Sequence, residues 1–249
     1  MQNGKSSCSN LSLYWNKLVF LENREMYLDK SERSKLPGIV IEKFVLSRDI
    51  FKEVYEVMNK RRDMVVEEFK RKGLLLLDVK KKLSSRLLVG SGAPSILEVG
   101  LTLSRNYGLP IVPSSSLKGT FRHYCEDSGI LNETELLNVF GTTDQGGGLV
   151  FLDAFPTGEV KFGLDVVANH FQPYYMNGEV PNDWYDPVPV KYVTVTSGTY
   201  RFTVLIEPTL KKELNEELKV KLKNAFLEML KVYGVGAKTN YGYGRFLED

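Results

Sequence analysis

Residues 218–246 read LKVKLKNAFLEMLKVYGVGAKTNYGYGRF, a helical pattern that runs directly into a loop rich in glycine and tyrosine. Apolar residues recur in its first half at spacings of three and four, as on the buried face of an amphipathic helix. This apolar stripe consists of Leu218, Leu222, Ala225, Phe226, Met229, Leu230 and Tyr233. Gly234 follows the stripe, where a glycine commonly ends a helix. The stretch predicts a long helix packed on a core, followed by a glycine-rich loop.

The glycine-rich loop, residues 234–246, has the composition of a segment that binds phosphates and bases. Glycines let backbone N–H groups approach an anion, lysine and arginine add positive charge, and tyrosine rings stack on bases. A P-loop would instead place Gly-x-x-x-x-Gly-Lys-Ser/Thr between a strand and a helix, so the loop suits a nucleic-acid backbone better than a free nucleotide. The candidate contact residues are Gly236, Lys238, Thr239, Tyr241, Tyr243 and Arg245. The alternative is a purely structural glycine turn beside a pair of core tyrosines.

A second candidate segment lies upstream, in PSSSLKGTFRHYCED, residues 113–127. Its serines can cap the start of a helix, where free N–H groups bind phosphate. Lys118 and Arg122 lie four residues apart and extend the positive charge along one face. Inside a helix, glycine is less favourable than alanine by about 1 kcal/mol. Gly119 is therefore interpreted as permitting the close approach of a ligand or another backbone. The candidate contact residues are Ser115, Ser116, Lys118 and Arg122; the alternative is an ordinary capped helix.

The order of the patterns from residue 87 onward indicates the fold. Strand, helix, strands, helix and strand follow one another, which is the order of a split βαβ, ferredoxin-like sheet. Leu97–Leu103 alternates apolar positions and predicts the first of these strands. Residues 190–196 and 200–206 alternate most clearly, and we predict that they pair as a hairpin turning at Ser197-Gly198.

The N-terminal part of the chain differs from the rest. Residues 11–27 and 48–72 have helical periodicity, and we expect residues 1–84 to form a helical extension packed on the core. Residues 85–249 are expected to form an RRM-like core with long loop insertions, so that the fold class is α+β. Within this core, Asn132-x-x-Glu135 predicts a capping box at the start of a second helix.

Charge is distributed unevenly along the chain, although 33 basic and 31 acidic residues leave a net charge of only +2. Residues 1–90 hold 19 basic and 12 acidic residues, or +7, and residues 91–209 hold 6 and 13, or −7. Residues 210–249 hold 8 and 6, or +2. The acidic middle third is therefore interpreted as including a subunit interface, for which Asp183 and Asp186 are the test positions.

Composition excludes several classes of protein. Two cysteines, Cys8 and Cys125, provide neither a disulfide framework nor a paired zinc site. The longest leucine run, Leu74–Leu77, is far shorter than the roughly 18 residues of a membrane span, and the N-terminus does not read as a signal peptide. We therefore expect a cytoplasmic protein with no metal or other cofactor and no membrane contact.

The segments 113–122 and 236–246 together resemble the RAMP superfamily of CRISPR-associated RNA-binding proteins. The family pattern is similar to Pro-Gly-Ser-Ser-Leu-Lys-Gly-x-x-Arg, and Ser114 stands where glycine is more usual. The central stretch is most similar to the sixth-subunit family of Cmr-type (type III-B) effector complexes. The motifs that carry this similarity are DAFP at 153–156, DVVANHFQPYY at 165–175 and PVPVKY at 187–192. The resemblance covers about residues 85–249.

This resemblance implies a non-catalytic RNA-binding subunit that holds the 3′ part of the CRISPR RNA and helps engage target RNA in antiviral defence. The implied partners are the CRISPR RNA, the target RNA, neighbouring RAMP backbone subunits and a small helical subunit. In the family, another backbone subunit cleaves the target. RNA contact, without a catalytic role, is therefore carried over to the candidate residues of the two segments.

Three enzymatic hypotheses stand beside this one. A metal-independent RAMP endoribonuclease needs a general base near a 2′-hydroxyl. His123 and Cys125 lie two residues apart on a predicted helix and do not face each other, so His170 is the candidate base. Metal-dependent cleavage has less support, because its candidate ligands are scattered: Asp153, Asp165, Asp183 and Asp186. The third hypothesis is a small-molecule phosphate enzyme built on the glycine-rich loop.

Overall fold

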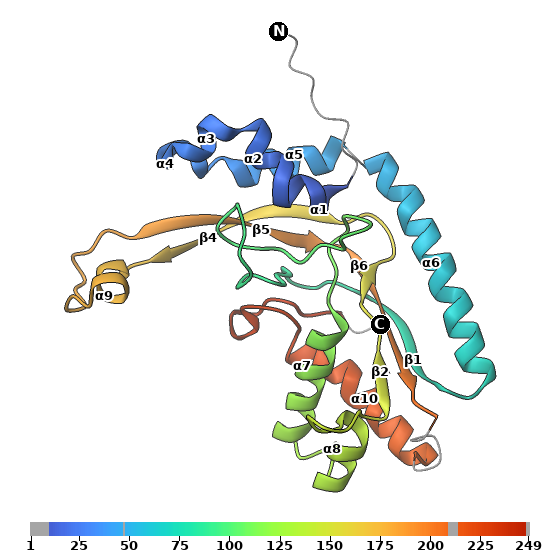
Figure 1. Cartoon of the computed structure of the whole chain (residues 1–249). Helices are drawn as coiled ribbons and strands as arrows, with labels where there is room; N and C mark the ends of the chain where they lie inside the picture. The colour runs from blue at the N-terminus through green and yellow to red at the C-terminus, as the bar shows by residue number, and fades with distance from the viewer. Residues whose placement is uncertain (1–9, 47, 209–213, 248–249) are drawn as a thin grey trace.

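A computed structural model describes residues 10–46, 48–208 and 214–247 and shows a mixture of helix and sheet (Figure 1). The helices are α1 (Leu11–Leu13), η1 (Tyr14–Leu18), α2 (Val19–Glu22), α3 (Arg24–Leu28), α4 (Lys30–Arg33), α5 (Leu36–Leu46), α6 (Arg48–Arg71), α7 (Ser114–Asp127), α8 (Glu133–Phe140), α9 (Gln172–Asn177), α10 (Glu216–Val232) and η3 (Thr239–Tyr241). The strands are β1 (Leu75–Lys82), β2 (Leu149–Phe151), β3 (Phe155–Pro156), β4 (Lys161–Asn169), β5 (Val188–Ser197) and β6 (Thr199–Ile206).

The main sheet has β6 at its centre. β1 and β2 lie on its two sides, β3 also pairs with it, and all of these pairings are antiparallel. All residues of β6 from Tyr200 to Ile206 are buried, and Phe202 packs its ring 6.1 Å from that of Phe226 on α10. Phe226 in turn lies 5.2 Å from Phe121 of α7. The helices α7 and α10 therefore cover one face of this sheet, as the periodicity of residues 200–206 and 218–233 predicts.

The predicted hairpin of β5 and β6 is wrong. β5 pairs with β4, whereas β6 pairs with β1, β2 and β3. Gly198 lacks the positive φ that the expected two-residue turn requires, so the backbone continues in an extended conformation. Residues 83–87 pair across this junction: the N–H of Leu83 donates to Gly198 O at 2.8 Å, and Leu87 bridges Val195. β5 and β6 thus form one nearly continuous strand that passes from one sheet to the other.

The hairpin of β4 and β5, residues 161–197, is named the arm. It extends away from α7 and α10 and has α9 near its far end (Figure 1). Its registered pairs run from Phe162↔Val195 to Asn169↔Val188. Near its base, α5 packs on the arm, where the ring of Phe44 lies 3.8 Å from that of Phe162.

The described part of the N-terminal segment is largely helical from Leu11 to Arg71, as predicted, but it ends in β1, which pairs along the main sheet with β6. The sheet therefore includes part of the segment 1–84 that we expected to be a helical extension. The predicted strand Leu97–Leu103 is also absent: the structure shows turns and irregular chain there, and Glu98 has a φ of 67° that interrupts extended backbone.

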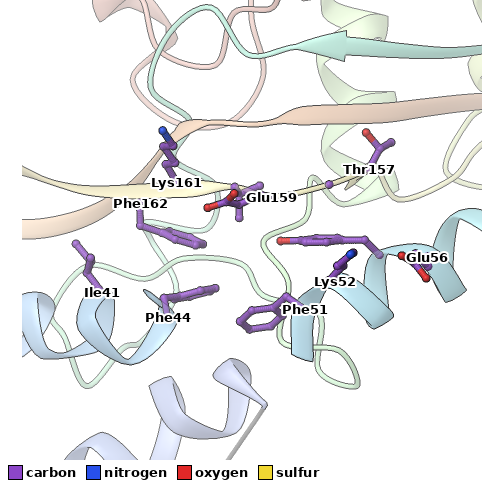
Figure 2. A pocket seen from close by; sticks show the side chains of 12 residues that line it. Ile41, Phe44, Phe51, Lys52, Glu56, Thr157, Glu159, Lys161 and Phe162 are labelled. Atoms are coloured by element: carbon purple, nitrogen blue, oxygen red, sulfur yellow. The ribbon is translucent and has the colours of Figure 1, made fainter. Parts of the chain in front are cut away.

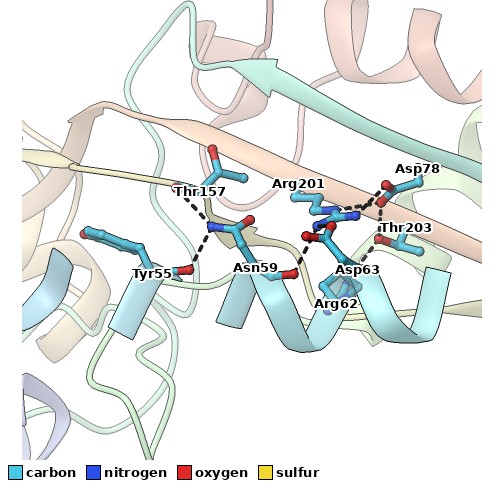
Figure 3. A network of polar contacts seen from close by, with 8 residues as sticks. All are labelled: Tyr55, Asn59, Arg62, Asp63, Asp78, Thr157, Arg201 and Thr203. Carbon is cyan, nitrogen blue, oxygen red and sulfur yellow. Dashed lines mark hydrogen bonds and ion pairs between the residues drawn. The ribbon is translucent and has the colours of Figure 1, made fainter. Parts of the chain in front are cut away.

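A polar network holds α6 on the other face of the main sheet (Figure 3). Arg201 on β6 is nearly buried and donates to both carboxylate oxygens of Asp78 on β1, at 2.9 and 2.7 Å, and to Asp63 on α6 at 2.6 Å. Thr203 donates to Asp78 at 2.8 Å and accepts from Arg62 of α6 at 2.9 Å. Burial, followed by the nearby Arg201 charge, lowers the pKa of Arg62 to about 10.

Candidate nucleic-acid interface

Helix α7 and the glycine-rich loop meet across an open groove of about 800 Å³. The two segments that sequence reasoning singled out separately are therefore neighbours. The groove is lined by Gly119, Thr120, His123, Asp127, Val232, Tyr233, Gly234, Gly236, Thr239, Asn240 and Arg245. Of the sequence-predicted contact residues, only Gly236, Thr239 and Arg245 line it.

Glycines give the loop its compact path. At Gly236, with a φ of 95°, an added Cβ would lie 2.4 Å from Leu88 O. At Gly244, with a φ of 71°, it would lie 1.9 Å from Val235 O. The N–H groups of Ala237 and Gly244 donate to the carbonyls of residues 88 and 86, both at 2.7 Å. These glycines let the loop pack on residues 86–88, and the N–H groups of Ala237 and Gly244 are not free to hold an anion.

The two tyrosines of the loop have different surroundings. The hydroxyl of Tyr243 donates to the Asp165 carboxylate of β4 and lies 3.2 Å from the hydroxyl of Tyr192. Burial, and then the hydrogen bond to Asp165, raise the pKa of Tyr243. Tyr241 is 84% exposed, so its ring remains accessible for stacking. The structural alternative describes Tyr243, whereas only Tyr241 has the exposure that base stacking needs.

Lys238 lies on the side of the loop that faces the arm. It has a φ of 62°, and its Nζ lies 5.3 Å from the ring centre of Tyr192 and 5.9 Å from that of Tyr241. The guanidinium of Arg86 is 3.3 Å from Asp165 in the same cluster. Burial acts to raise the pKa of Asp165, but hydrogen bonds from Tyr243 and Val166 N–H, together with the nearby cations, lower it overall.

On α7, the predicted basic residues do not line the groove. Arg122 pairs with Glu126 at 2.8 Å and donates to Gly141 O, at the end of α8, at 3.4 Å. Lys118 and Ser116 are half-buried and Ser115 is exposed. At the helix start, the N–H of Ser114 already donates to Asp153 at 2.7 Å. Lys118 and Arg122 therefore lie outside the groove, and RNA contact by these two residues stays a prediction.

The groove face of α7 carries residues that are not among the sequence-predicted contact residues. Gly119, Thr120, His123 and Asp127 recur at spacings of one helical turn, which places them together. The Nε2 atom of His123 is 3.5 Å from Asp127, and the Tyr233 hydroxyl donates to the same carboxylate. This hydrogen bond is the largest cause that raises the pKa of Tyr233. The helical spacing of these residues is visible in the sequence. The sequence does not show which face of α7 lies next to the glycine-rich loop, so this spacing alone does not identify the groove face.

Other features lie outside the groove. His170 is exposed at the far end of β4, on the arm. Among the described residues, no three His, Cys, Asp or Glu side chains are grouped so as to hold a metal ion. Within the same parts of the chain, no helix has both the length and the apolar character needed to span a bilayer.

A second cavity, of about 520 Å³, shares no lining residue with the groove. Figure 2 shows it between the helices α5 and α6 and residues 157–162. Phe44, Phe51 and Phe162 form its aromatic wall, and Lys52 and Glu56 stand at its α6 side (Figure 2).

Comparison with known proteins gives relatives over nearly the whole chain. A Pyrococcus furiosus protein named "CRISPR system Cmr subunit Cmr6" is 28% identical, over 96% of this chain and 94% of the relative. A Saccharolobus solfataricus protein of the same name is 25% identical, over 99% of this chain and 83% of the relative.

The fold has a counterpart among solved structures. A chain in the cryo-EM structure of "the Type III-B Cmr-beta bound to cognate target RNA" matches with a TM-score of 0.66 and 23% identity, over 95% of this chain and 88% of that chain. The sequence model of the RAMP superfamily matches residues 82–247, which include β2, β3 and β6 of the main sheet, α7, the arm and the glycine-rich loop. This chain therefore belongs to the RAMP superfamily.

Proposed function

We propose that this protein is a non-catalytic, RNA-binding subunit of a type III-B (Cmr) CRISPR effector complex. The observation that carries the proposal is the groove between α7 and the glycine-rich loop, which is lined by an exposed arginine and by hydroxyl and amide side chains. The exposed ring of Tyr241 follows the lining residue Asn240 directly in the chain. The similarity to two relatives named as Cmr subunits supports the assignment to such a complex.

The groove offers the contacts that a single RNA strand needs. Arg245 can pair with a phosphate, while Thr120, Thr239 and Asn240 can hydrogen-bond phosphate or ribose oxygens. Tyr241 offers a face for a base, and Lys238 is close enough to add charge beside that base. Because backbone contacts carry no sequence information, this site would hold RNA of any sequence.

The finer parts of the proposal concern location and partners. We assign the groove to the 3′ part of the CRISPR RNA, with target RNA, neighbouring RAMP subunits and a small helical subunit as further partners in the cytoplasm. A ferredoxin-like core is consistent with β6 lying between β1 and β2 and with the antiparallel bridge of Leu83 to Phe246, which continues the sheet beyond β1.

RNA cleavage by this subunit has less support. His170, the candidate base, does not line the groove. The small-molecule phosphate hypothesis is weakened by the loop, which follows a helix and uses N–H groups of Ala237 and Gly244 internally.

The test is RNA binding by the full chain, measured by fluorescence anisotropy over a series of salt concentrations. The probe is a labelled oligonucleotide with the 3′ sequence of the CRISPR RNA. Arg245→Ala should weaken binding and reduce the salt slope by about 1, as expected for one lost phosphate contact. Tyr241→Ala should cost about 1–3 kcal/mol without that change in slope.

The matched control is Lys80→Ala, which removes an exposed charge on β1, outside the groove. It should leave RNA binding almost unchanged. Equal affinities and salt slopes for wild type, Arg245→Ala and Tyr241→Ala would refute the groove as the RNA site. Site-specific cleavage of the probe in the presence of a chelator, abolished by His123→Ala or His170→Ala, would refute the non-catalytic assignment.

A further inference from the structure

The far end of the arm, residues 170–187, exposes large apolar side chains. Tyr175 is 69% exposed, Met176 75%, Val180 80% and Trp184 88%. Single exposed apolar residues are ordinary, but a group that includes tryptophan, tyrosine and methionine on one projecting element is typical of an interaction surface. We name residues 170–187 the arm tip.

Hydrogen bonds within the arm tip organise its loop. The hydroxyl of Tyr185 donates to Glu179 at 3.2 Å and lies 3.1 Å from the carbonyl oxygen of Val180. Asn177 donates to the other oxygen of Glu179 at 3.1 Å, and the N–H of Trp184 donates to Asn182 at 3.1 Å. Tyr175 and Met176 are therefore displayed on α9, and Val180 and Trp184 on a loop with its own internal hydrogen bonds. Such preorganisation lowers the entropic cost of binding.

The charge of this region distinguishes between possible partners. From residue 162 to residue 190 the chain contains no lysine or arginine, but it contains four acids, Asp165, Glu179, Asp183 and Asp186. Asp183 and Asp186 are exposed on either side of Trp184. A nucleic acid carries a negative charge on every phosphate and would be repelled by this tip. A protein surface with an apolar pocket edged by lysine or arginine complements it.

We propose that the arm tip docks into a basic-rimmed apolar pocket on another protein, with Trp184 as the anchor and Asp183 and Asp186 as its charged rim. The partner is a protein subunit of the same effector complex, an assignment that rests on the proposed function. Anchors of this kind dominate binding when they fill a pocket from which surrounding contacts exclude water.

The experiment measures binding of the full chain to each other subunit of its own complex, purified separately, by biolayer interferometry without RNA. Wild type should bind at least one of them, and the double variant Trp184→Ala/Met176→Ala should bind that subunit at least about tenfold more weakly. Asp183→Asn/Asp186→Asn should weaken binding at low salt and lose its effect at high salt, because rim charges act through screened electrostatics. Met64→Ala is the matched control, since Met64 on α6 is 65% exposed outside the arm.

Three results would overturn the docking proposal. They are failure of the wild-type chain to bind any of the subunits, equal binding by wild type and the Trp184→Ala/Met176→Ala variant, and loss of RNA probe binding in that variant. The last result would assign the tip to RNA instead. Failure of the proposed function would give a different result. RNA affinity and salt slope would then be unchanged in Arg245→Ala, while the arm-tip variants would still lose subunit binding.

Discussion

At Gly244, the loop leaves no room for a side chain. Gly244→Ala should destabilise the protein, since alanine would have to adopt a φ of 71° and its Cβ would lie 1.9 Å from Val235 O. The backbone strain alone corresponds to about 1–3 kcal/mol. Urea unfolding measures this cost. Gly38→Ala is the control, because a Cβ there meets nothing within 4 Å; an equal loss in both variants would contradict the close approach at Gly244.

Gly119 should give the opposite result. A Cβ at this position of α7 meets nothing within 4 Å, so Gly119→Ala should raise the free energy of unfolding by about 1 kcal/mol through helix propensity. The same variant should bind the RNA probe more weakly, because its methyl group would enter the groove. Stability and affinity would therefore change in opposite directions. An affinity equal to that of wild type would mean that RNA does not approach α7 at this position.

The Asp78 carboxylate links stability to pH. Burial acts to raise its pKa, but hydrogen bonds from Arg201 and Thr203 lower it overall below the ordinary 3.8. The folded state therefore binds this proton more weakly than the unfolded state, and the stabilisation is present above about pH 4 and lost as the pH falls further. Asp78→Asn should cost about 3–5 kcal/mol at neutral pH, because it leaves the nearly buried Arg201 short of one partner.

The measurement is urea unfolding of wild type and Asp78→Asn between about pH 6 and about pH 3. The stability difference between the two proteins should shrink toward acid. Asp144→Asn, an exposed substitution, is the control and should change stability by less than about 0.5 kcal/mol. A difference that grows toward low pH would contradict a lowered pKa for Asp78.

Among the elements, α8 begins with a complete capping box. The N–H of Glu135 donates to the Asn132 side chain, and the N–H of Asn132 donates to the Glu135 side chain, both at 2.9 Å. Asn132→Ala should cost about 1 kcal/mol of stability, measured by urea unfolding. Glu133→Ala, in the same helical turn, should cost only a few tenths of a kcal/mol. Equal costs would mean that the box contributes no more than the charge of the first turn.

Elements whose signal is local were predictable from the sequence. The capping box of α8, the buried stripe of α10 and the alternation along β6 follow from interactions within a few residues. The pairing of β5 could not be predicted in this way. Ser197-Gly198 has the composition of a turn, and β4, the true partner of β5, is separated from it by a long connection. The same holds for the candidate site. Both segments that line the groove were singled out from the sequence, but which face of α7 lines it depends on the glycine-rich loop, which lies far along the chain.

At the scale of the whole molecule, the described residues form two clusters of buried apolar side chains that meet at Phe162. One lies between the main sheet and the helices α7 and α10. The other lies among the N-terminal helices, the first turns of α6, residues 97–109 and the base of the arm. Phe162 packs against both clusters. Because Phe162 is only partly buried, Phe162→Ala should lower the free energy of unfolding by less than the value for a fully buried phenylalanine, which is about 3–5 kcal/mol. The loss should mainly weaken the packing where the two clusters meet.

Hydrogen exchange monitored by mass spectrometry tests this expectation. In Phe162→Ala, amides of α5 and of the arm base should exchange faster, whereas those of α10 should change little, since their cluster keeps its other contacts. Leu21→Ala, which truncates a side chain that is 66% exposed, is the control and should leave all three regions unchanged. Uniform acceleration over the whole chain would mean that the two clusters unfold as a single cooperative unit.

The unbroken path of β5 into β6 has a mechanical consequence. A displacement of the arm would be transmitted along the same backbone to Arg201 in the middle of the main sheet, and through the hydrogen bond of Tyr243 to Asp165 it would also reach the glycine-rich loop. The arm also contacts the body through the packing of Phe44 on Phe162 and the bridge of Leu87 to Val195, and Gly198 has no positive φ at which the strand could hinge. We therefore expect a partner bound at the arm tip to be held at a fixed distance from a ligand bound in the groove.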